Sequence, residues 1–294
     1  MSVYLVTGGA GFIGSNLTEA LLTQGEDVNV LDNFSTGRRE NLADVEKWAA
    51  EGGGKFTLIE GDIRDVDTCS SAVKAADYVL HQAAIPSVVR SVEDPTSTNA
   101  VNIGGTLNLL EAARKHGVDG FVIASSSSLY GDSEVLPKVE SMPPNPISPY
   151  GLQKLTAESY CRLFHALYGV PTVALRYFNV FGPRQDPSSD YAAVVPRFIT
   201  AMKSGGQPTI YGDGEQTRDF TFIRNVVQAN LLAARANGNA QGRAFNIAYG
   251  DRISLNDLVK QIGQLLGVQV SVDYQEARVG DIRRRRSGRA GGQY

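Results

Sequence analysis

Thr7-Gly-Gly-Ala-Gly-Phe-Ile-Gly14 is the stretch of sequence that decides the fold. The apolar run Val3–Thr7 leads into it, and Phe12–Gln24 shows the spacing of an amphipathic helix. Glycines between a strand and a helix permit a tight turn, and they let the backbone approach a pyrophosphate at the helix N-terminus. The stretch therefore predicts a dinucleotide-binding turn. The alternative, a glycine-rich turn without a ligand, fits this strand–turn–helix context less well.

Apolar runs and helical patterns alternate along the first part of the chain. This alternation is typical of a parallel sheet with helices on both faces, and so of an α/β fold with a doubly wound Rossmann sheet. We expect further strands at Val28–Leu31, Phe56–Ile59, Tyr78–His81, Phe121–Ala124 and Pro171–Tyr177. We expect the helices between them at about residues 40–50, 65–75, 95–116 and 150–168.

The regular alternation weakens after Tyr177, and Gly182–Asp190 is loop-like. Later helices are expected near residues 191–204, 223–236 and 255–266. We therefore divide the chain into a dinucleotide-binding domain, residues 1–178, and a smaller α/β C-terminal substrate domain, residues 179–294. Some segments of the second part are expected to cross back to the first.

Composition narrows the class of protein. Hydrophobic residues make up 42% and charged residues 20% of the 294 positions, as in an ordinary globular protein. The net charge of −3 gives no general attraction to nucleic acid or to a membrane, and Arg283–Arg286 is interpreted as a solvated tail. No apolar run is long enough for a membrane helix or a signal peptide. Two isolated cysteines, Cys69 and Cys161, indicate reduced thiols and a cytoplasmic protein.

Asp32 stands at the end of the second expected strand. A carboxylate there accepts hydrogen bonds from the adenosine ribose and repels a 2′-phosphate, so NAD is favoured over NADP. Arg38 and Arg39 follow closely and could soften this preference. A turn cap is the alternative role for Asp32. Asp62, after the third strand, could either cap a turn or contact adenine, and both roles stay open.

Tyr150 and Lys154 are four residues apart on an expected helix, so they share one face. A tyrosine titrates near ~10, too high for a base at neutral pH, and a nearby ammonium favours the phenolate. Such a pair suits general acid–base catalysis. The spacing alone is common, and a surface pair would be the default interpretation without the glycine turn upstream.

Ser125–Ser128 follow the fifth strand, at the sheet edge where ligands bind. A serine hydroxyl there can bond the reacting oxygen of a substrate, and a polar strand-end turn is the alternative. His81, His116 and His165 are scattered without the spacing of metal ligands, so we predict no metal.

Taken together, these motifs resemble the extended short-chain dehydrogenase/reductases, and within them the UDP-sugar 4-epimerases that act on UDP-glucose or UDP-N-acetylglucosamine. The resemblance covers about residues 3–284. Besides the glycine turn and the serine run, it rests on Gly61-Asp-Ile-Arg-Asp65, His81-Gln-Ala-Ala84, Asn102-Ile-Gly-Gly-Thr106, Tyr150-Gly-Leu-Gln-Lys154, Arg176-Tyr-Phe-Asn179 and Gly212-Asp-Gly-Glu-Gln-Thr-Arg-Asp219.

The resemblance implies a C4 epimerisation of a UDP-hexose through a 4-keto intermediate, with NAD bound throughout and Tyr150, Lys154 and Ser126 as catalytic residues. It implies that NAD is lined by Gly8, Gly11, Phe12, Ile13, Asp32, Asn33, Ser35, Gly37, Asp62, Ile63, Ala83, Ala84, Tyr150, Lys154 and Tyr177. It implies substrate contacts from Ser87, Ser126, Asn179, Arg218, Arg252, Arg278 and Asp281. A homodimer through the helices near residues 95–115 and 150–168 is also implied.

Ser127 and Ser128 stand where related 4,6-dehydratases carry an acidic pair and related decarboxylases a glutamate, so epimerisation is preferred. A UDP-glucuronate epimerase or decarboxylase and a 4,6-dehydratase stay open as alternatives on the same scaffold. An NAD-sensing regulator is the alternative without catalysis, which the Tyr150–Lys154 pair disfavours. The tail from Arg283 departs from the family pattern, and it leaves the choice between N-acetylated and plain sugars open.

Overall fold

The computed structural model describes residues 1–187 and 194–276. Its centre is a seven-stranded, fully parallel sheet with the strand order β11-β6-β5-β4-β1-β2-β3. The sheet confirms the expected doubly wound Rossmann topology, in which the order reverses between β1 and β4. The strands are β1 (Val3–Thr7), β2 (Asp27–Asp32), β3 (Phe56–Glu60), β4 (Tyr78–His81), β5 (Gly120–Ser126), β6 (Thr172–Tyr177) and β11 (Arg243–Ile247).

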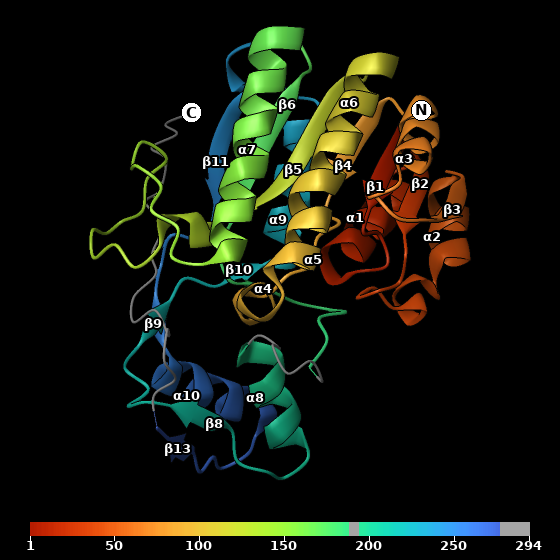
Figure 1. Ribbon diagram of the computed structural model, residues 1–294. Helices are drawn as coiled ribbons and strands as arrows, with labels where there is room; N and C mark the ends of the chain where they lie inside the picture. The colour runs from red at the N-terminus through yellow and green to blue at the C-terminus, as the bar shows by residue number, and fades with distance from the viewer. Residues whose placement is uncertain (188–193, 277–294) are drawn as a thin grey trace.

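Helices cover both faces of this sheet (Figure 1). On one face lie α3 (Val66–Lys74), α6 (Thr106–His116) and α7 (Pro149–Tyr168); on the other lie α1 (Phe12–Thr23), α2 (Val45–Gly52) and α9 (Ile223–Ala234). The reason is the alternation of side chains along each strand, which sends neighbours to opposite faces. Leu5 of β1 packs with the first group, and Val6 packs with the second.

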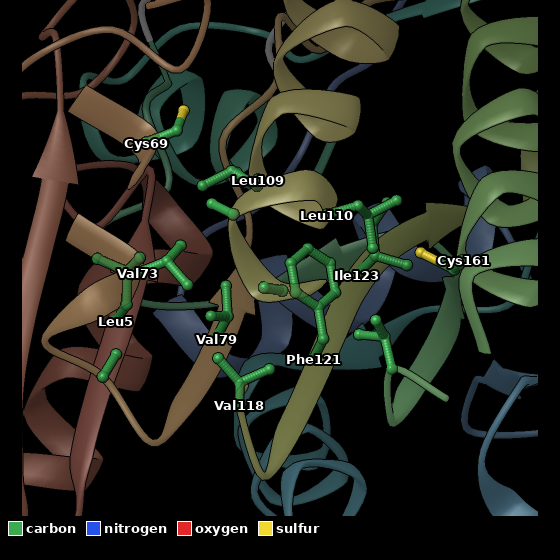
Figure 2. Packing of buried hydrophobic residues seen from close by; sticks show 14 of the residues in the cluster. Leu5, Cys69, Val73, Val79, Leu109, Leu110, Val118, Phe121, Ile123 and Cys161 are labelled. Atoms are coloured by element: carbon green, nitrogen blue, oxygen red, sulfur yellow. The ribbon is translucent and has the colours of Figure 1, made fainter. Parts of the chain in front are cut away.

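Figure 2 shows the first of these two cores, where side chains of α3 and α6 meet β5. Phe121 and Leu109 are fully buried there. Burial of such a side chain contributes about 1.5–3 kcal/mol each, so this core fixes the sheet edge against the helices. The rigid edge is what positions the loops described below.

The expected helix at residues 95–116 is three segments in succession. They are α5 (Pro95–Asn99), a π-helix at Ala100–Gly105 and α6. The expected helix at residues 40–50 is likewise a 3-10 turn, Arg39–Leu42, followed by α2. A π-helical turn within an α-helix is rare and frequently marks a functional site.

A second, smaller core lies beside the large sheet and is built from α8 (Val194–Lys203), α10 (Leu255–Leu266) and the parallel pair β8 (Thr209–Tyr211) and β13 (Asp273–Gln275) (Figure 1). Phe198, Met202, Ile210 and Ile262 fill it. Two further pairs of short strands occur in this later part of the chain. They are β7 (Val180–Phe181) with β10 (Thr221–Phe222), and β9 (Thr217–Arg218) with β12 (Ile253–Ser254).

Two segments beyond residue 178 contribute to the large sheet. Helix α9 packs through Ile223, Val226 and Ala234 into the second face, and β11 pairs with β6 as an added strand. The division of the chain at residue 178 stays a prediction. In the part of the chain that the structure describes, no helix has the length and apolar composition needed to cross a bilayer.

Candidate active site

A cavity of about 720 Å³ lies where β1, β2, β4, β5 and β6 end at the carboxyl edge of the large sheet. Ligands of open α/β sheets bind at this edge, beside the point where the strand order reverses. Every position expected to line NAD also lines this cavity, as do Ser87, Ser126 and Asn179. The structure thus brings the expected cofactor residues and the expected catalytic residues to one site.

The glycine turn is closely packed beneath the cavity. Gly8 has φ +69°, and a Cβ there would lie 2.8 Å from the backbone of Ala83. A Cβ on Gly14 would lie 2.1 Å from the carbonyl oxygen of Gly8, so only glycine lets α1 begin this close to the turn. Gly11 caps α1 without a side-chain hydrogen bond. The N-terminus of α1 therefore presents backbone N–H groups to the cavity, as a pyrophosphate requires.

Asp32 is 7% exposed and holds two loops together. One carboxylate oxygen accepts from the Ala10 N–H at 2.9 Å, and the other accepts from the Phe34 N–H at 2.8 Å. Asp32 thus caps a turn and also lines the cavity, so the cap leaves a contact with a ligand open. Each carboxylate oxygen has a further lone pair, which can accept from a ribose hydroxyl.

The two arginines after β2 contact acidic side chains. Arg38 lies 3.3 Å from Asp186, and Arg39 lies 2.7 Å from Glu60. Asp62 accepts from Asn33 and is paired with Arg64 at 2.7 Å, and the Arg64 guanidinium holds the pKa of this carboxyl down to about 2. Asp62 also accepts from the Arg64 N–H at 2.8 Å, as a turn cap does, and it lines the cavity, so both roles considered for it stay open.

Tyr150 and Lys154 lie one turn apart at the start of α7. Ser148 caps the N-terminus of the helix, because its hydroxyl accepts from the Gly151 N–H, and Pro149 is the first helical residue. The Lys154 Nζ donates to the carbonyl oxygen of Ala124 at 2.9 Å and lies 5.8 Å from the centroid of the Tyr150 ring. Burial lowers the pKa of Lys154 to about 8.

Among Ser125–Ser128, Ser126 is the residue that lines the cavity and keeps its hydroxyl proton available for a ligand. Its oxygen accepts from the Ser128 N–H at 3.2 Å and from the Ser128 hydroxyl at 2.9 Å, which keeps its own proton for donation. Ser125 also lines the cavity, but its hydroxyl donates to Glu158 at 2.9 Å. Ser127 and Ser128 are buried and lie outside the cavity lining.

Ser87 has φ +111°, a conformation that non-glycine residues rarely adopt. It begins α4 (Val88–Glu93), and its hydroxyl accepts from the Arg90 N–H at 3.2 Å. Asn102, in the π-helix, holds the preceding loop because its side chain accepts from the Ile85 N–H at 2.8 Å and donates to Gln153 at 2.8 Å. Such a supported backbone outlier is typical of functional sites.

The expected substrate residues are divided between two places. Asn179 lines the first cavity, and its amide donates to the Asp219 carbonyl at 2.8 Å. Arg218 and Arg252 line a second cavity of about 600 Å³, together with Lys260 of α10. Arg278 and Asp281 lie outside the described residues.

Sequence reasoning missed several residues of the first cavity. They are Gln82, Arg90, Arg184, Gln185 and Asp186. The last three follow β6 and β7 in the segment interpreted only as loop-like. Ser125–Ser128 were selected because ligands bind where parallel strands end. This segment also follows the end of a strand, so its polar side chains could have been selected for the same reason.

The histidines have structural partners. His81 is fully buried between the hydroxyls of Thr7 and Thr106, while His116 bonds Ser70 and His165 bonds the Val170 carbonyl. Across residues 1–187 and 194–276, no group of three or more histidine, cysteine or acidic side chains is arranged to hold a metal ion.

Comparison with known proteins identifies the family. The model of the NAD dependent epimerase/dehydratase family matches residues 4–248. A putative UDP-glucose 4-epimerase of Methanocaldococcus jannaschii is 40% identical over 282 residues, which cover 95% of this chain and 88% of that protein.

Two solved structures share the fold closely. The UDP-N-acetylglucosamine 4-epimerase of Methanobrevibacter ruminantium M1, in complex with UDP-N-acetylmuramic acid, is 40% identical with a TM-score of 0.90, and the match covers 97% of this chain and 89% of that one. The UDP-glucose 4-epimerase of Thermotoga maritima, with UDP-glucose, is 38% identical with a TM-score of 0.89 and the same coverage. The chain therefore belongs to the NAD dependent epimerase/dehydratase family, as an NAD-dependent epimerase.

Proposed function

We propose that the protein interconverts UDP-glucose and UDP-galactose by inverting C4, and that it also accepts the pair UDP-N-acetylglucosamine and UDP-N-acetylgalactosamine. The observation that carries this proposal is the shared cavity. It combines a dinucleotide-type glycine turn with Tyr150, Lys154 and Ser126. The UDP-sugar 4-epimerases named above support the choice of substrate class.

The residues of the cavity fit NAD. We assign the pyrophosphate to the N-terminus of α1, where Gly8, Gly11 and Gly14 line the cavity. We assign the adenosine ribose to Asp32, which repels a 2′-phosphate. When bound, NAD supplies a reversible hydride acceptor, so an epimerisation leaves no net oxidation.

The chain's own residues would move the proton. The Tyr150 phenolate takes the proton of the C4 hydroxyl as the C4–H bond breaks, which leaves a 4-keto sugar. Ser126 donates to the C4 oxygen throughout, and the Lys154 ammonium favours the phenolate electrostatically. After the 4-keto sugar has turned its other face, the Tyr150 phenol returns the proton to the C4 oxygen as a C4–H bond re-forms.

The serine run favours epimerisation over related reactions. Elimination of water or loss of a carboxylate uses a further acid–base group near the sugar. Ser127 and Ser128 stand at the matching positions, and both are buried away from the cavity lining. Epimerisation, in contrast, uses one proton-transfer group, which Tyr150 provides.

For the nucleotide part of the substrate we assign Asn179, Arg218 and Arg252, with Arg278 and Asp281. The guanidinium of an arginine meets phosphate oxygens bidentately, which suits a diphosphate. Arg218 and Arg252 come from the paired strand β9 and the residue before β12, so they are fixed relative to each other. We assign Ser87 to the sugar, because it lines the first cavity.

We further propose a homodimer through the helical segments of residues 95–115 and helix α7 of two copies. Helix α7 exposes Leu152, Leu163, Leu167 and Tyr168. Contiguous exposed apolar side chains mark interaction surfaces. Sedimentation tests this proposal, and a monomer at all concentrations would contradict it. A cytoplasmic location is proposed on the two free cysteines, Cys69 and Cys161.

The experiment is to incubate the purified protein, without added NAD, with UDP-glucose, UDP-N-acetylglucosamine or UDP-glucuronate, and to identify the products. C4 epimers of the first two sugars support the proposal. A 4-keto-6-deoxy sugar or a decarboxylated pentose would instead support a dehydratase or a decarboxylase. Bound NAD without conversion of any sugar would favour an NAD-sensing regulator.

A further inference from the structure

The segment that carries Ser126 is fastened to other elements on both sides of this serine. Ser126 is the last residue of β5, and a 3-10 turn that ends at Tyr130 follows it. On one side, the Ser125 hydroxyl donates to Glu158 Oε2 at 2.9 Å. On the other side, the Tyr130 hydroxyl accepts from Arg176 Nη1 at 2.6 Å. The serine therefore lies between two anchors, which α7 and β6 supply.

The two anchoring side chains, Glu158 and Arg176, form one unit. Arg176 donates through Nη2 to Glu158 Oε1 at 2.6 Å and through Nε to Glu158 Oε2 at 3.0 Å. Both side chains are nearly buried, with exposed fractions of 6% for Arg176 and 12% for Glu158. A buried ion pair is often no more stabilising than apolar side chains of the same volume, but two hydrogen bonds fix the direction of both groups. The pair therefore suits a role in holding geometry.

The topology of the sheet explains why this pair reaches both anchors. Arg176 in β6 is the register partner of Ser125 in β5, so their side chains leave the sheet on the same face. Helix α7 packs on that face, and Glu158 lies on it two turns after Tyr150. Residues spaced by four along a helix share one side, so Tyr150, Lys154 and Glu158 point the same way. The pair thus ties the serine segment to the helix that carries Tyr150.

We propose that Glu158 and Arg176 are positioning residues for the reaction, which hold Ser126 at a fixed place relative to Tyr150. This inference rests on the proposed function, in which Ser126 donates to the C4 oxygen while Tyr150 moves the proton. Ser126 and Tyr150 line the same cavity but come from different elements, whereas Glu158 and Arg176 do not line it. A displacement of about 1 Å can cost about 10²-fold in rate, so loss of an anchor should lower kcat.

The test removes one anchor at a time and leaves the ion pair in place, because loss of one charge would itself destabilise the fold. Ser125→Ala removes the donor to Glu158, and we expect kcat with UDP-glucose to fall about 10- to 100-fold at a nearly unchanged KM. Ser125→Thr keeps a hydroxyl and should recover most of the lost rate. Ser159→Ala, on α7, loses a hydroxyl that donates to the Leu155 carbonyl within the helix, and this matched control should keep the wild-type kcat.

A double-mutant cycle shows whether the anchors act through Ser126. Ser126→Ala lowers kcat by itself, and Ser125→Ala added to it should cause little further loss, because the hydroxyl that is being positioned is already gone. Tyr130→Phe removes the second anchor and should follow the same pattern. Losses that multiply in the double variants would overturn the proposal, since the anchors would then act independently of Ser126.

An unchanged kcat in Ser125→Ala would also overturn the proposal. Urea unfolding of each variant gives its folded fraction, so that kcat is expressed per folded molecule. A wild type that converts no UDP-sugar would overturn the proposed function together with this inference. An active wild type beside an equally active Ser125→Ala would overturn this inference alone.

Discussion

The ammonium of Lys154 lies 5.8 Å from the centroid of the Tyr150 ring and is held there by the carbonyl oxygen of Ala124, at 2.9 Å. Ala124 belongs to β5, so the catalytic helix is tied to the sheet edge through the lysine. This contact fixes where a positive charge sits relative to the phenol. The proposed proton transfer depends on that placement.

Replacing Tyr150 with phenylalanine should lower kcat by about 10²–10⁴-fold while NAD stays bound, since the ring remains and only the proton-transferring hydroxyl is lost. Steady-state kinetics and the NAD content of the purified protein check both parts. Tyr160→Phe, on the same helix, is the control and should keep wild-type turnover. Near-normal activity of Tyr150→Phe would remove this residue from the mechanism.

Activity should decline as pH rises through about 8. Burial lowers the pKa of Lys154 to about 8, and the lysine is charged only below its pKa. Above that pH the ammonium that favours the phenolate is lost, so kcat/KM should fall on the alkaline side. Lys154→Arg stays charged across this range. If that variant keeps measurable activity, its alkaline decline should disappear, whereas an unchanged decline would assign it to another group.

The sequence predicted most of the large sheet because six strands carry clear apolar runs between helical patterns. Strand β11 was missed, since Arg243–Ile247 has no continuous apolar run, is only partly buried and lies at the sheet edge. Its place depends on pairing with β6, which local sequence does not encode.

The cofactor turn and the Tyr150–Lys154 pair could be predicted because their spacing is local. The place of residues 184–186 at this cavity could not, because it depends on the contact of their loop with α1, about 170 positions earlier in the chain. Arg218 and Arg252 were expected to hold the UDP moiety; the structure places them at a second cavity, and their role stays a prediction. Spacing in sequence does not fix which of two cavities a distant loop reaches.

Glu158→Gln should destabilise the protein by about 3–5 kcal/mol, because it leaves a buried guanidinium without the negative charge that balances it. Arg176 pairs with Glu158 at 2.6 Å, and both side chains are nearly buried. The exposed pair Arg39–Glu60 provides the control, and Glu60→Gln should change stability by less than about 1 kcal/mol. Urea unfolding compares the two variants, and similar losses in both would show that burial does not set the difference.

His81 is neutral, and both of its ring nitrogens have hydrogen-bond partners. The Thr106 hydroxyl donates to the Asn102 carbonyl, so its oxygen accepts from His81 Nε2–H at 2.9 Å. His81 Nδ1 is then an acceptor and receives the Thr7 hydroxyl at 2.7 Å. A second proton would remove that acceptor. Burial, with the nearby charge of Lys154, lowers the pKa of His81 to about 3.

Acid should therefore destabilise the protein through His81. In the unfolded chain His81 binds a proton below the ordinary histidine pKa of about 6.5, whereas in the folded chain it does not until about pH 3. The stability that neutral His81 contributes is therefore fully present above about pH 6.5 and is lost as the pH falls. Between about pH 7.5 and about pH 5 this group alone should remove about 2 kcal/mol. His81→Asn keeps a side-chain oxygen as acceptor for Thr7 but cannot titrate, so its free energy of unfolding should fall less over that interval than the wild type's. Urea unfolding at both pH values measures the difference, and parallel losses in the two proteins would show that His81 binds its proton in the folded state.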